Sequence, residues 1–105
     1  LSTAVRYGCD MLVLVIDNGG YGTIRMHQER AFPGRVSGTG LANPDFAALA
    51  RAHGGWAETV DETARFAPAL EQAMQRKGLR LLHLKTDMEH LAAIGLTVSM
   101  LRARR

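Results

Sequence analysis

A short, unbroken apolar run sets the strongest limit on how this chain folds. Residues 11–16 read MLVLVI, and a run of this length that is rich in β-branched residues is typical of a strand covered on both faces of a parallel sheet. The run stops at residues 17–22, DNGGYG, where glycines break the pattern. We therefore expect a buried strand that ends in a glycine turn.

Periodic apolar residues on both sides of this strand predict alternating helices and strands. Helices are expected over residues 1–7, 23–30, 43–53 and 96–102, and around the stripe Phe66, Leu70, Ala73 and Met74, which Gly78 ends. Further strands are expected over residues 56–60 and 79–86, and a loop on the active-site side over residues 31–42. This order predicts an α/β fold, a three-layer parallel sheet with helices on both faces.

Several local expectations follow from single residues. Asn43 should cap the helix that starts at Pro44, because Asn accepts bonds from free N–H groups and proline has no N–H to lose. The inward stripe of that helix should be Phe46, Leu49, Ala50 and His53. Cys9 should be a small buried residue at a helix end, and His83 an exposed or hydrogen-bonded strand residue.

Length, composition and charge favour one ordinary globular domain. The 105 residues allow one modest core, and a composition of 47% hydrophobic and 22% charged residues argues against disorder. The net charge of +3 comes from Arg102, Arg104 and Arg105, since without them ten basic residues face ten acidic ones. We expect these arginines to form a solvated terminus, with no nucleic-acid partner.

The sequence also indicates the cellular compartment in which the protein is expected. Cys9 is the only cysteine, which excludes an internal disulfide and fits a reducing environment. No apolar run approaches the roughly 18 residues that a membrane span needs, and residue 1 onward does not read as a signal peptide. We expect a soluble, cytoplasmic protein with no membrane partner. The chain opens inside what reads as a helix, so we expect a fragment of a longer protein.

The glycine turn is the place where chemistry is expected. Ligands of open α/β sheets collect at the carboxyl ends of the strands, and glycines let a backbone approach a ligand closely. Asn18 offers an amide oxygen, and the following helix offers a positive N-terminal end; both suit a magnesium diphosphate. A purely structural chain reversal is the alternative, because the loop matches neither the P-loop nor the dinucleotide pattern.

The sequence resembles a known family over nearly its whole length. The segments LVLVIDNGGYGTIRMHQE, then PG, then NPDFAALARAHGG, are similar to the diphosphate-binding domain of thiamine diphosphate-dependent enzymes, notably the acetolactate synthase-like and benzoylformate decarboxylase-like groups. The resemblance implies that residues 1–105 are the C-terminal part of such a domain. It also implies thiamine diphosphate and Mg²⁺ as cofactors.

The resemblance assigns roles to the turn and the helix after it. Asn18 corresponds to the side-chain ligand of Mg²⁺, and Gly20 supplies a backbone carbonyl to the same ion. Three more residues would bind the cofactor, and a fourth would line the substrate pocket: Tyr21 and Gly22 along the turn, Thr23 facing the diphosphate, and His27 toward the substrate. Asp17 stands where the family usually has asparagine, which alters the charge beside the ligand.

Two family features have no counterpart in this sequence. The Gly-Asp-Gly motif that supplies another magnesium ligand does not occur, and no glutamate matches the context of the one that activates the cofactor in a separate domain. The chain alone is therefore expected to bind the cofactor weakly or not at all and to be inactive. No residue is assigned a catalytic role.

The resemblance implies that the intact protein is a lyase or transferase that acts on 2-oxo acids such as pyruvate, by decarboxylation, by carboligation, or by both. Family members build their sites between subunits, so a homo-oligomer, a dimer or tetramer, is implied. Two alternatives stay open at this point. The chain could be a non-catalytic structural or interaction module derived from such a domain, or an unrelated α/β nucleotide-binding domain.

Other polar residues point less clearly to a site. Arg25 and Arg30 suit an acidic substrate or a second subunit as well as they suit a solvated helix face. Glu89 and His90 are not expected to share a metal, because adjacent residues of a helix do not face the same way. His53 is expected to interact with the free carbonyls at the end of its helix.

Overall fold

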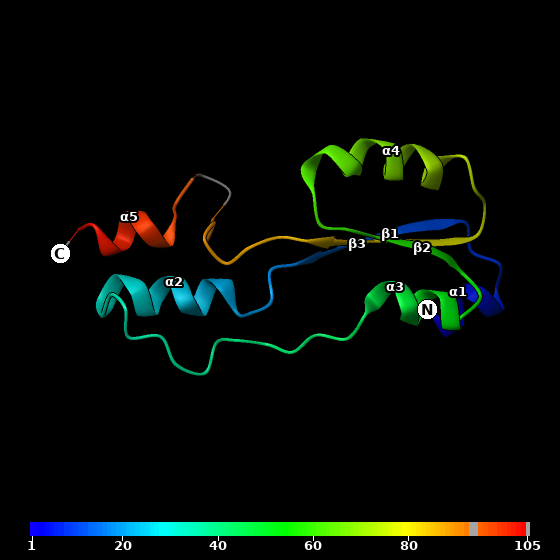
Figure 1. Cartoon of the computed structure of the whole chain (residues 1–105). Helices are drawn as coiled ribbons and strands as arrows, with labels where there is room; N and C mark the ends of the chain where they lie inside the picture. Colours follow the sequence, from blue (N-terminus) through cyan, green and yellow to red (C-terminus); the bar gives the residue numbers. More distant parts are fainter. Residues whose placement is uncertain (93–94, 105) are drawn as a thin grey trace. The chain divides into compact units, whose positions relative to one another are not determined.

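The computed structural model describes residues 1–92 and 95–104, so the part of the expected basic tail at Arg105 lies outside the described residues. Two compact units are present: Leu1–Asp17 with Asn43–Lys85, and Asn18–Ala42 with Thr86–Arg105. The elements are α1 (Ser2–Arg6), β1 (Met11–Asp17), α2 (Gly22–Ala31), α3 (Phe46–Ala52), β2 (Trp56–Val60), α4 (Thr63–Met74), β3 (Leu79–Lys85) and α5 (Val98–Arg102), as Figure 1 shows.

The first unit is a three-stranded parallel sheet between helices. The strand order is β1-β3-β2, with Met11 opposite Leu79 in one pair of strands and Trp56 opposite Arg80 in the other. Helix α4 covers one face, and α1 and α3 lie on the other (Figure 1). The predicted α/β fold with helices on both faces of a parallel sheet is confirmed.

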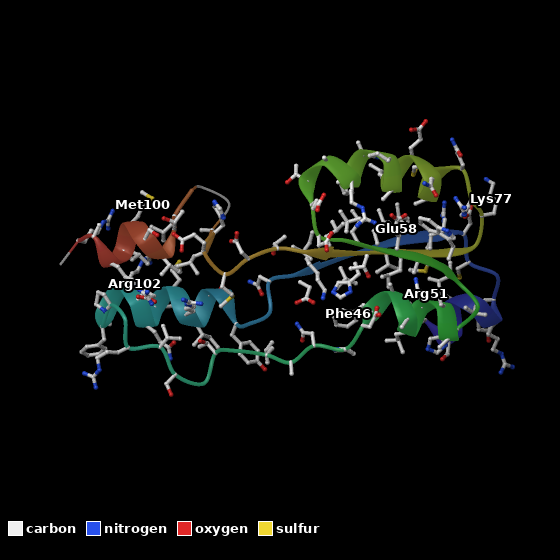
Figure 2. The ribbon with its side chains drawn as sticks, in the orientation of Figure 1. Phe46, Arg51, Glu58, Lys77, Met100 and Arg102 are labelled. Carbon is white, nitrogen blue, oxygen red and sulfur yellow. The ribbon has the colours of Figure 1, made fainter. Side chains whose placement is uncertain are left out.

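Alternation along β3 divides the core between the two faces. Leu81 packs with Ala47, Ala50 and Ala57 under α3, whereas Leu82 packs under α4 with Val60, Ala69 and Ala73. Residues 79–83 are all buried, as expected for the central strand. Arg51 of α3, labelled in Figure 2, donates from Nη1 to the Ala57 carbonyl at 2.9 Å and so ties this helix to β2.

Strand β1 departs from the expectation of cover on both faces. It pairs with β3 alone among the described strands, and Leu14 and Ile16 are 46% and 66% exposed. The reason is the position of α4, which packs mainly over β2 and β3. The apolar run is a strand as predicted, but its outer residues face solvent in this unit.

The start of α3 also differs from the prediction. The helix begins at Phe46, and Asp45 caps it by accepting from the Ala48 N–H at 2.9 Å. This bond is the main reason why the pKa of Asp45 lies below its ordinary value. The expected cap at Asn43 is wrong, because the helix starts at Phe46 and Asp45 is the residue directly before it. Leu49, expected in the inward stripe, is 43% exposed.

Two further local expectations are wrong. Cys9 is exposed, because it lies in the connection between α1 and β1 rather than against the core. Helix α4 ends at Met74 and not at Gly78. Gly78 instead adopts a φ of 81° directly before β3, a conformation that glycine reaches without strain.

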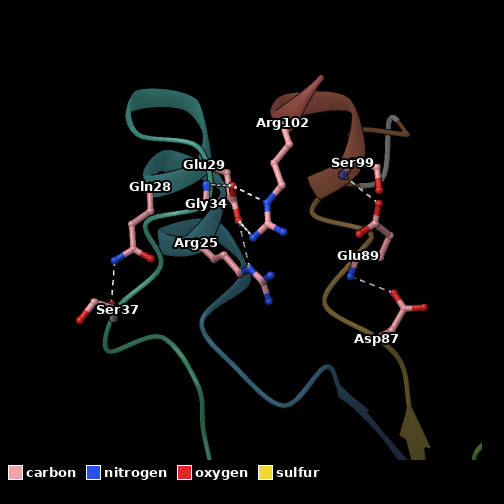
Figure 3. Close-up of polar contacts among 9 residues, drawn as sticks. All are labelled: Arg25, Gln28, Glu29, Gly34, Ser37, Asp87, Glu89, Ser99 and Arg102. Carbon is pink, nitrogen blue, oxygen red and sulfur yellow. Dashed lines mark hydrogen bonds and ion pairs between the residues drawn. The ribbon is translucent and has the colours of Figure 1, made fainter. Parts of the chain in front are cut away.

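The second unit is held together by contacts between α2 and α5. These helices lie side by side, and Glu29 of α2 accepts from Arg102 of α5 (Figure 3). Helix α5 begins at Val98, where the Thr97 side chain caps it by accepting from the Met100 N–H. Among residues 1–92 and 95–104, no helix has the length and apolarity needed to cross a bilayer.

Candidate functional site

The residues of the glycine turn form a compact local structure. Asn18 follows β1 in the chain, and its Oδ1 accepts from the Gly20 N–H at 3.1 Å, which closes a side-chain turn across Gly19. Gly19 has a φ of 72°, a left-handed conformation that favours glycine. Asn18 and Gly20 are both half-buried. The turn is therefore built from the residue types that the sequence analysis singled out.

The turn pairs with a distant part of the loop after α2. Gly20 and Gly40 form an antiparallel bridge, in which Tyr21 N–H donates to the Thr39 carbonyl at 2.9 Å and Leu41 N–H donates to the Gly19 carbonyl at 2.8 Å. The expected loop over residues 31–42 thus has a defined role at one end. Through these two hydrogen bonds, residues 39–41 hold the glycine turn in place.

Two of the three glycines in residues 17–22, Gly20 and Gly22, are needed for space rather than for a special φ. A β-carbon on Gly20 would lie 2.5 Å from the Thr39 carbonyl oxygen and 2.9 Å from Met88 Cε. A β-carbon on Gly22 would lie 2.9 Å from Asn18 Nδ2, so the glycine leaves room for the Asn18 amide. A larger residue at position 20 would displace the turn or the 39–41 stretch, and one at position 22 would displace the Asn18 amide.

The first turn of α2 is suited to an anion. The helix begins at Gly22 after the N-cap residue Tyr21; no side chain caps it, and its first turn contains no acidic residue. The first N–H groups of a helix have no partner within the helix and carry partial positive charge. Thr23 lies in this first turn and is exposed.

The oxygen atoms of the turn fit a magnesium ion chemically. Asn18 Oδ1 accepts one N–H and keeps a second lone pair, and no donor in residues 1–92 or 95–104 bonds the Gly20 carbonyl. Neutral amide and carbonyl oxygens are hard ligands of the kind that Mg²⁺ accepts beside phosphate and water. The same ranges contain no cluster of three His, Cys, Asp or Glu residues able to hold a metal, so a metal here would depend on other ligands as well.

The residues expected along α2 occupy different surroundings. His27 is exposed, and Ile24 is 53% exposed. Arg25 reaches the buried Glu29, with Nε 3.8 Å from Oε1, as Figure 3 shows. Glu29 is the buried residue of this helix, so α2 buries a charged side chain rather than an apolar stripe.

A polar cluster in the first unit was missed from the sequence. Asp17 accepts from Asn43 Nδ2 on Oδ1 at 2.7 Å, and its Oδ2 lies 2.7 Å from His83 Nε2. His83 is 1% exposed, and the Phe46 ring meets the imidazole edge-on at 5.1 Å between centroids. Of the two expectations for His83, the hydrogen-bonded one is confirmed. One signal was available, namely a histidine within the otherwise apolar core of LRLLHLK.

The polar residues near α5 serve the local structure. The Glu89 side chain accepts from the Ser99 N–H at 2.9 Å, and hydrogen bonding from the side chain and then the backbone of Ser99 lowers the pKa of Glu89. Asp87 accepts from the His90 ring at 3.2 Å, and its pKa is lowered chiefly by that bond. Glu89 lies in a bend and His90 in an isolated bridge with Thr97, so neither lies in a helix.

Comparison with known proteins identifies the family. The family described as thiamine pyrophosphate enzyme, C-terminal TPP binding domain, matches residues 1–84. An acetolactate synthase of Arthrospira platensis is 30% identical over 91 residues, which cover 85% of this chain and 16% of that protein. The mitochondrial acetolactate synthase catalytic subunit of Aspergillus candidus is 30% identical over 87 residues, which cover 83% of this chain and 12% of that protein.

The family match extends from α1 into β3 and includes the glycine turn. These matches confirm the resemblance found in the sequence and remove the alternative of an unrelated nucleotide-binding domain. The chain spans less than a fifth of the length of either relative. The chain therefore belongs to the family described as thiamine pyrophosphate enzyme, C-terminal TPP binding domain.

Proposed function

We propose that this chain binds the diphosphate of thiamine diphosphate through a Mg²⁺ ion held by Asn18 Oδ1 and the Gly20 carbonyl oxygen. The observation that carries the proposal is the turn itself, which presents two neutral oxygens directly before an uncapped helix N-terminus. The oxygens suit the metal, and the N–H groups of the helix suit the phosphate charge. The family assignment makes thiamine diphosphate the diphosphate of choice.

The neighbouring residues take supporting roles in this proposal. Gly22 leaves space for the Asn18 amide, and Tyr21 and Thr23 flank the start of α2, where the diphosphate would lie. His27, one turn further along α2 from Thr23, would face the substrate. Bound thiamine diphosphate supplies an electron sink for cleaving or forming a bond next to a carbonyl, and the protein residues bind and orient it.

The activity of the intact protein is a proposal that extends beyond this chain. We infer that residues 1–105 are the C-terminal part of the diphosphate-binding domain of an acetolactate synthase-like lyase or transferase. Its substrates would be 2-oxo acids, and it would act as a cytoplasmic homo-oligomer. The relatives named acetolactate synthase support this inference over 83–85% of the chain. The remaining magnesium ligand and the activating glutamate would come from the rest of the polypeptide.

Calorimetric titration with thiamine diphosphate and Mg²⁺ tests the proposal. The titration is run on this chain and on a longer polypeptide that contains it, each with and without Asn18→Ala. We expect measurable binding in the longer polypeptide and a loss of at least about tenfold in affinity on removal of the Asn18 oxygen. Gln75→Ala removes an exposed amide that follows α4 and should leave the affinity unchanged.

Two other outcomes of the titration would contradict the proposal. If neither polypeptide binds, the non-catalytic structural module is the better description. If binding is intact in Asn18→Ala, the metal is held by other atoms and the assignment of Asn18 is wrong.

A further inference from the structure

Asp17 and Asn43 mark the two points where the chain passes between the units. Asp17 precedes the segment Asn18–Ala42, and Asn43 follows it. The two side chains are joined by a 2.7 Å hydrogen bond from Asn43 Nδ2 to Asp17 Oδ1. The bond lies within the first unit, and it joins the two ends of the segment that carries all the residues of this chain that we propose to bind the cofactor.

The two residues of this bond match, in their sequence spacing, the backbone pairs of the second unit. Asp17 pairs with Asn43, Gly19 with Leu41, and Tyr21 with Thr39, so each pair lies two residues further along one stretch and two residues back along the other. The first pair is joined by side chains and the next two by backbone hydrogen bonds. Because it holds the two ends of segment 18–42 together, the Asp17–Asn43 bond lowers the entropy cost of forming the ladder of backbone pairs within the second unit.

His83 fixes the Asp17 carboxylate from the sheet side. Its Nε2 lies 2.7 Å from Asp17 Oδ2, and the imidazole is buried between β3 and Phe46. An ionised carboxylate only accepts, so Nε2 is the donor in this bond. Asp17 thus has one oxygen held by the central strand and the other by Asn43. An asparagine at position 17 has only one acceptor oxygen, whereas aspartate serves both partners as an acceptor.

We propose that Asp17, Asn43 and His83 form a positioning cluster that fixes both ends of segment 18–42 and thereby holds the Asn18–Gly20 turn in its paired conformation. The three are positioning residues, because they act through the ladder and not on the cofactor. Their relevance to cofactor binding rests on the proposed function. Their effect on the turn does not, and it can be measured on the chain without any ligand.

Amide hydrogen exchange followed by NMR tests the cluster. Asn43→Ala removes only the hydrogen bond from Asn43 to Asp17 and leaves the Asp17–His83 pair in place. The first unit is therefore expected to stay folded. We expect the Tyr21 and Leu41 amides to exchange about tenfold faster, since they donate the next two bonds of the ladder. The amides of β3 should keep their rates within about twofold, because the sheet does not use this bond.

Asp10→Ala is the matched control at the opposite end of β1. Asp10 accepts from Arg80 Nη2 at 2.8 Å and from the Gly78 N–H at 3.1 Å, so it also joins β1 to β3 through a carboxylate. Its removal should accelerate exchange near Met11 and Gly78 and leave the Tyr21 and Leu41 amides unchanged. Asp17→Asn should restore most of the protection lost in Asp17→Ala, because it keeps an acceptor for Asn43.

Either of two results would overturn the proposal. One is unchanged exchange of Tyr21 and Leu41 in Asn43→Ala. The other is an acceleration that is equal in Asn43→Ala and Asp10→Ala, which would show general loss of stability. If the exchange results are as expected but the chain and its longer form both fail to bind thiamine diphosphate with Mg²⁺, the positioning cluster stands and the proposed function fails.

Discussion

Gly20→Ala is expected to abolish the paired conformation of the glycine turn. The new β-carbon would lie 2.5 Å from the Thr39 carbonyl oxygen, a backbone atom that cannot rotate away, and 2.9 Å from Met88 Cε. Either the turn or the 39–41 stretch must move, which breaks the bridge to Gly40 and displaces the Gly20 carbonyl. We expect a loss of about 3 kcal/mol in the stability of this pairing. Exchange of the Tyr21 and Leu41 amides, measured by NMR, would report it.

Gly40→Ala is the matched control, because Gly40 faces Gly20 across the same bridge. No atom lies within 4 Å of a β-carbon built at this position, and its φ is not in the left-handed region. We expect a change of less than about 0.5 kcal/mol. Equal losses in both variants would mean that any added carbon disturbs the bridge, and the close contact with Thr39 would not be the cause.

The strands were predictable because their signal is local. The strand at Trp56–Val60 has the predicted bounds, and β1 and β3 each differ from prediction by one residue at the carboxyl end. Continuous apolar residues between glycine and polar breaks define such strands without any knowledge of the partners. What the local pattern could not give is the sheet order. With β1 at the edge of the described sheet, its Ile16 is exposed despite its apolar sequence.

The helix starts show where a local signal fails. Asn43-Pro44 reads as a helix start, yet the Asn43 side chain is used by Asp17, far away in the sequence. The helix begins at Phe46, and Asp45 caps it. The helix therefore starts three residues after Asn43, and the residue that caps it is the one directly before its first residue. Sequence alone does not reveal the long-range bond that Asn43 makes.

The candidate site was predictable in part for the same reason. Glycines and Asn18 after a buried strand are a local pattern, and the family resemblance gave them roles. The pairing with residues 39–41 and the cluster of Asp17, Asn43 and His83 join positions far apart in the chain. These contacts depend on the fold that brings the segments together, so no local rule could have indicated them.

Glu29→Gln is expected to loosen the helix pair of the second unit. Glu29 is fully buried and accepts from Arg102 Nη2 at 2.7 Å, from Arg102 Nε at 3.1 Å and from the Gly34 N–H at 2.9 Å. Glutamine keeps the shape but turns one acceptor into a donor that faces other donors. Hydrogen bonds to a charged group stabilise by about 1.5–3 kcal/mol, so we expect a loss of about 2 kcal/mol. Urea unfolding, followed by amide exchange in α2 and α5, would measure it.

The pH dependence gives this prediction a second, independent test. The hydrogen bond from Arg102 is the largest cause that holds the pKa of Glu29 below its ordinary value of 4.5. A carboxyl group whose pKa is lowered by folding adds stability above its ordinary pKa, and that stability is lost as the pH falls through the lowered value. The natural chain should therefore lose protection in α2 and α5 below about pH 4.5, and Glu29→Gln should remove this part of the pH dependence. Glu71→Gln changes an exposed carboxylate on α4 and should leave this part of the pH dependence intact. If the Glu29→Gln variant and the natural chain lose protection over the same pH range and to the same extent, the buried pair does not hold these helices together.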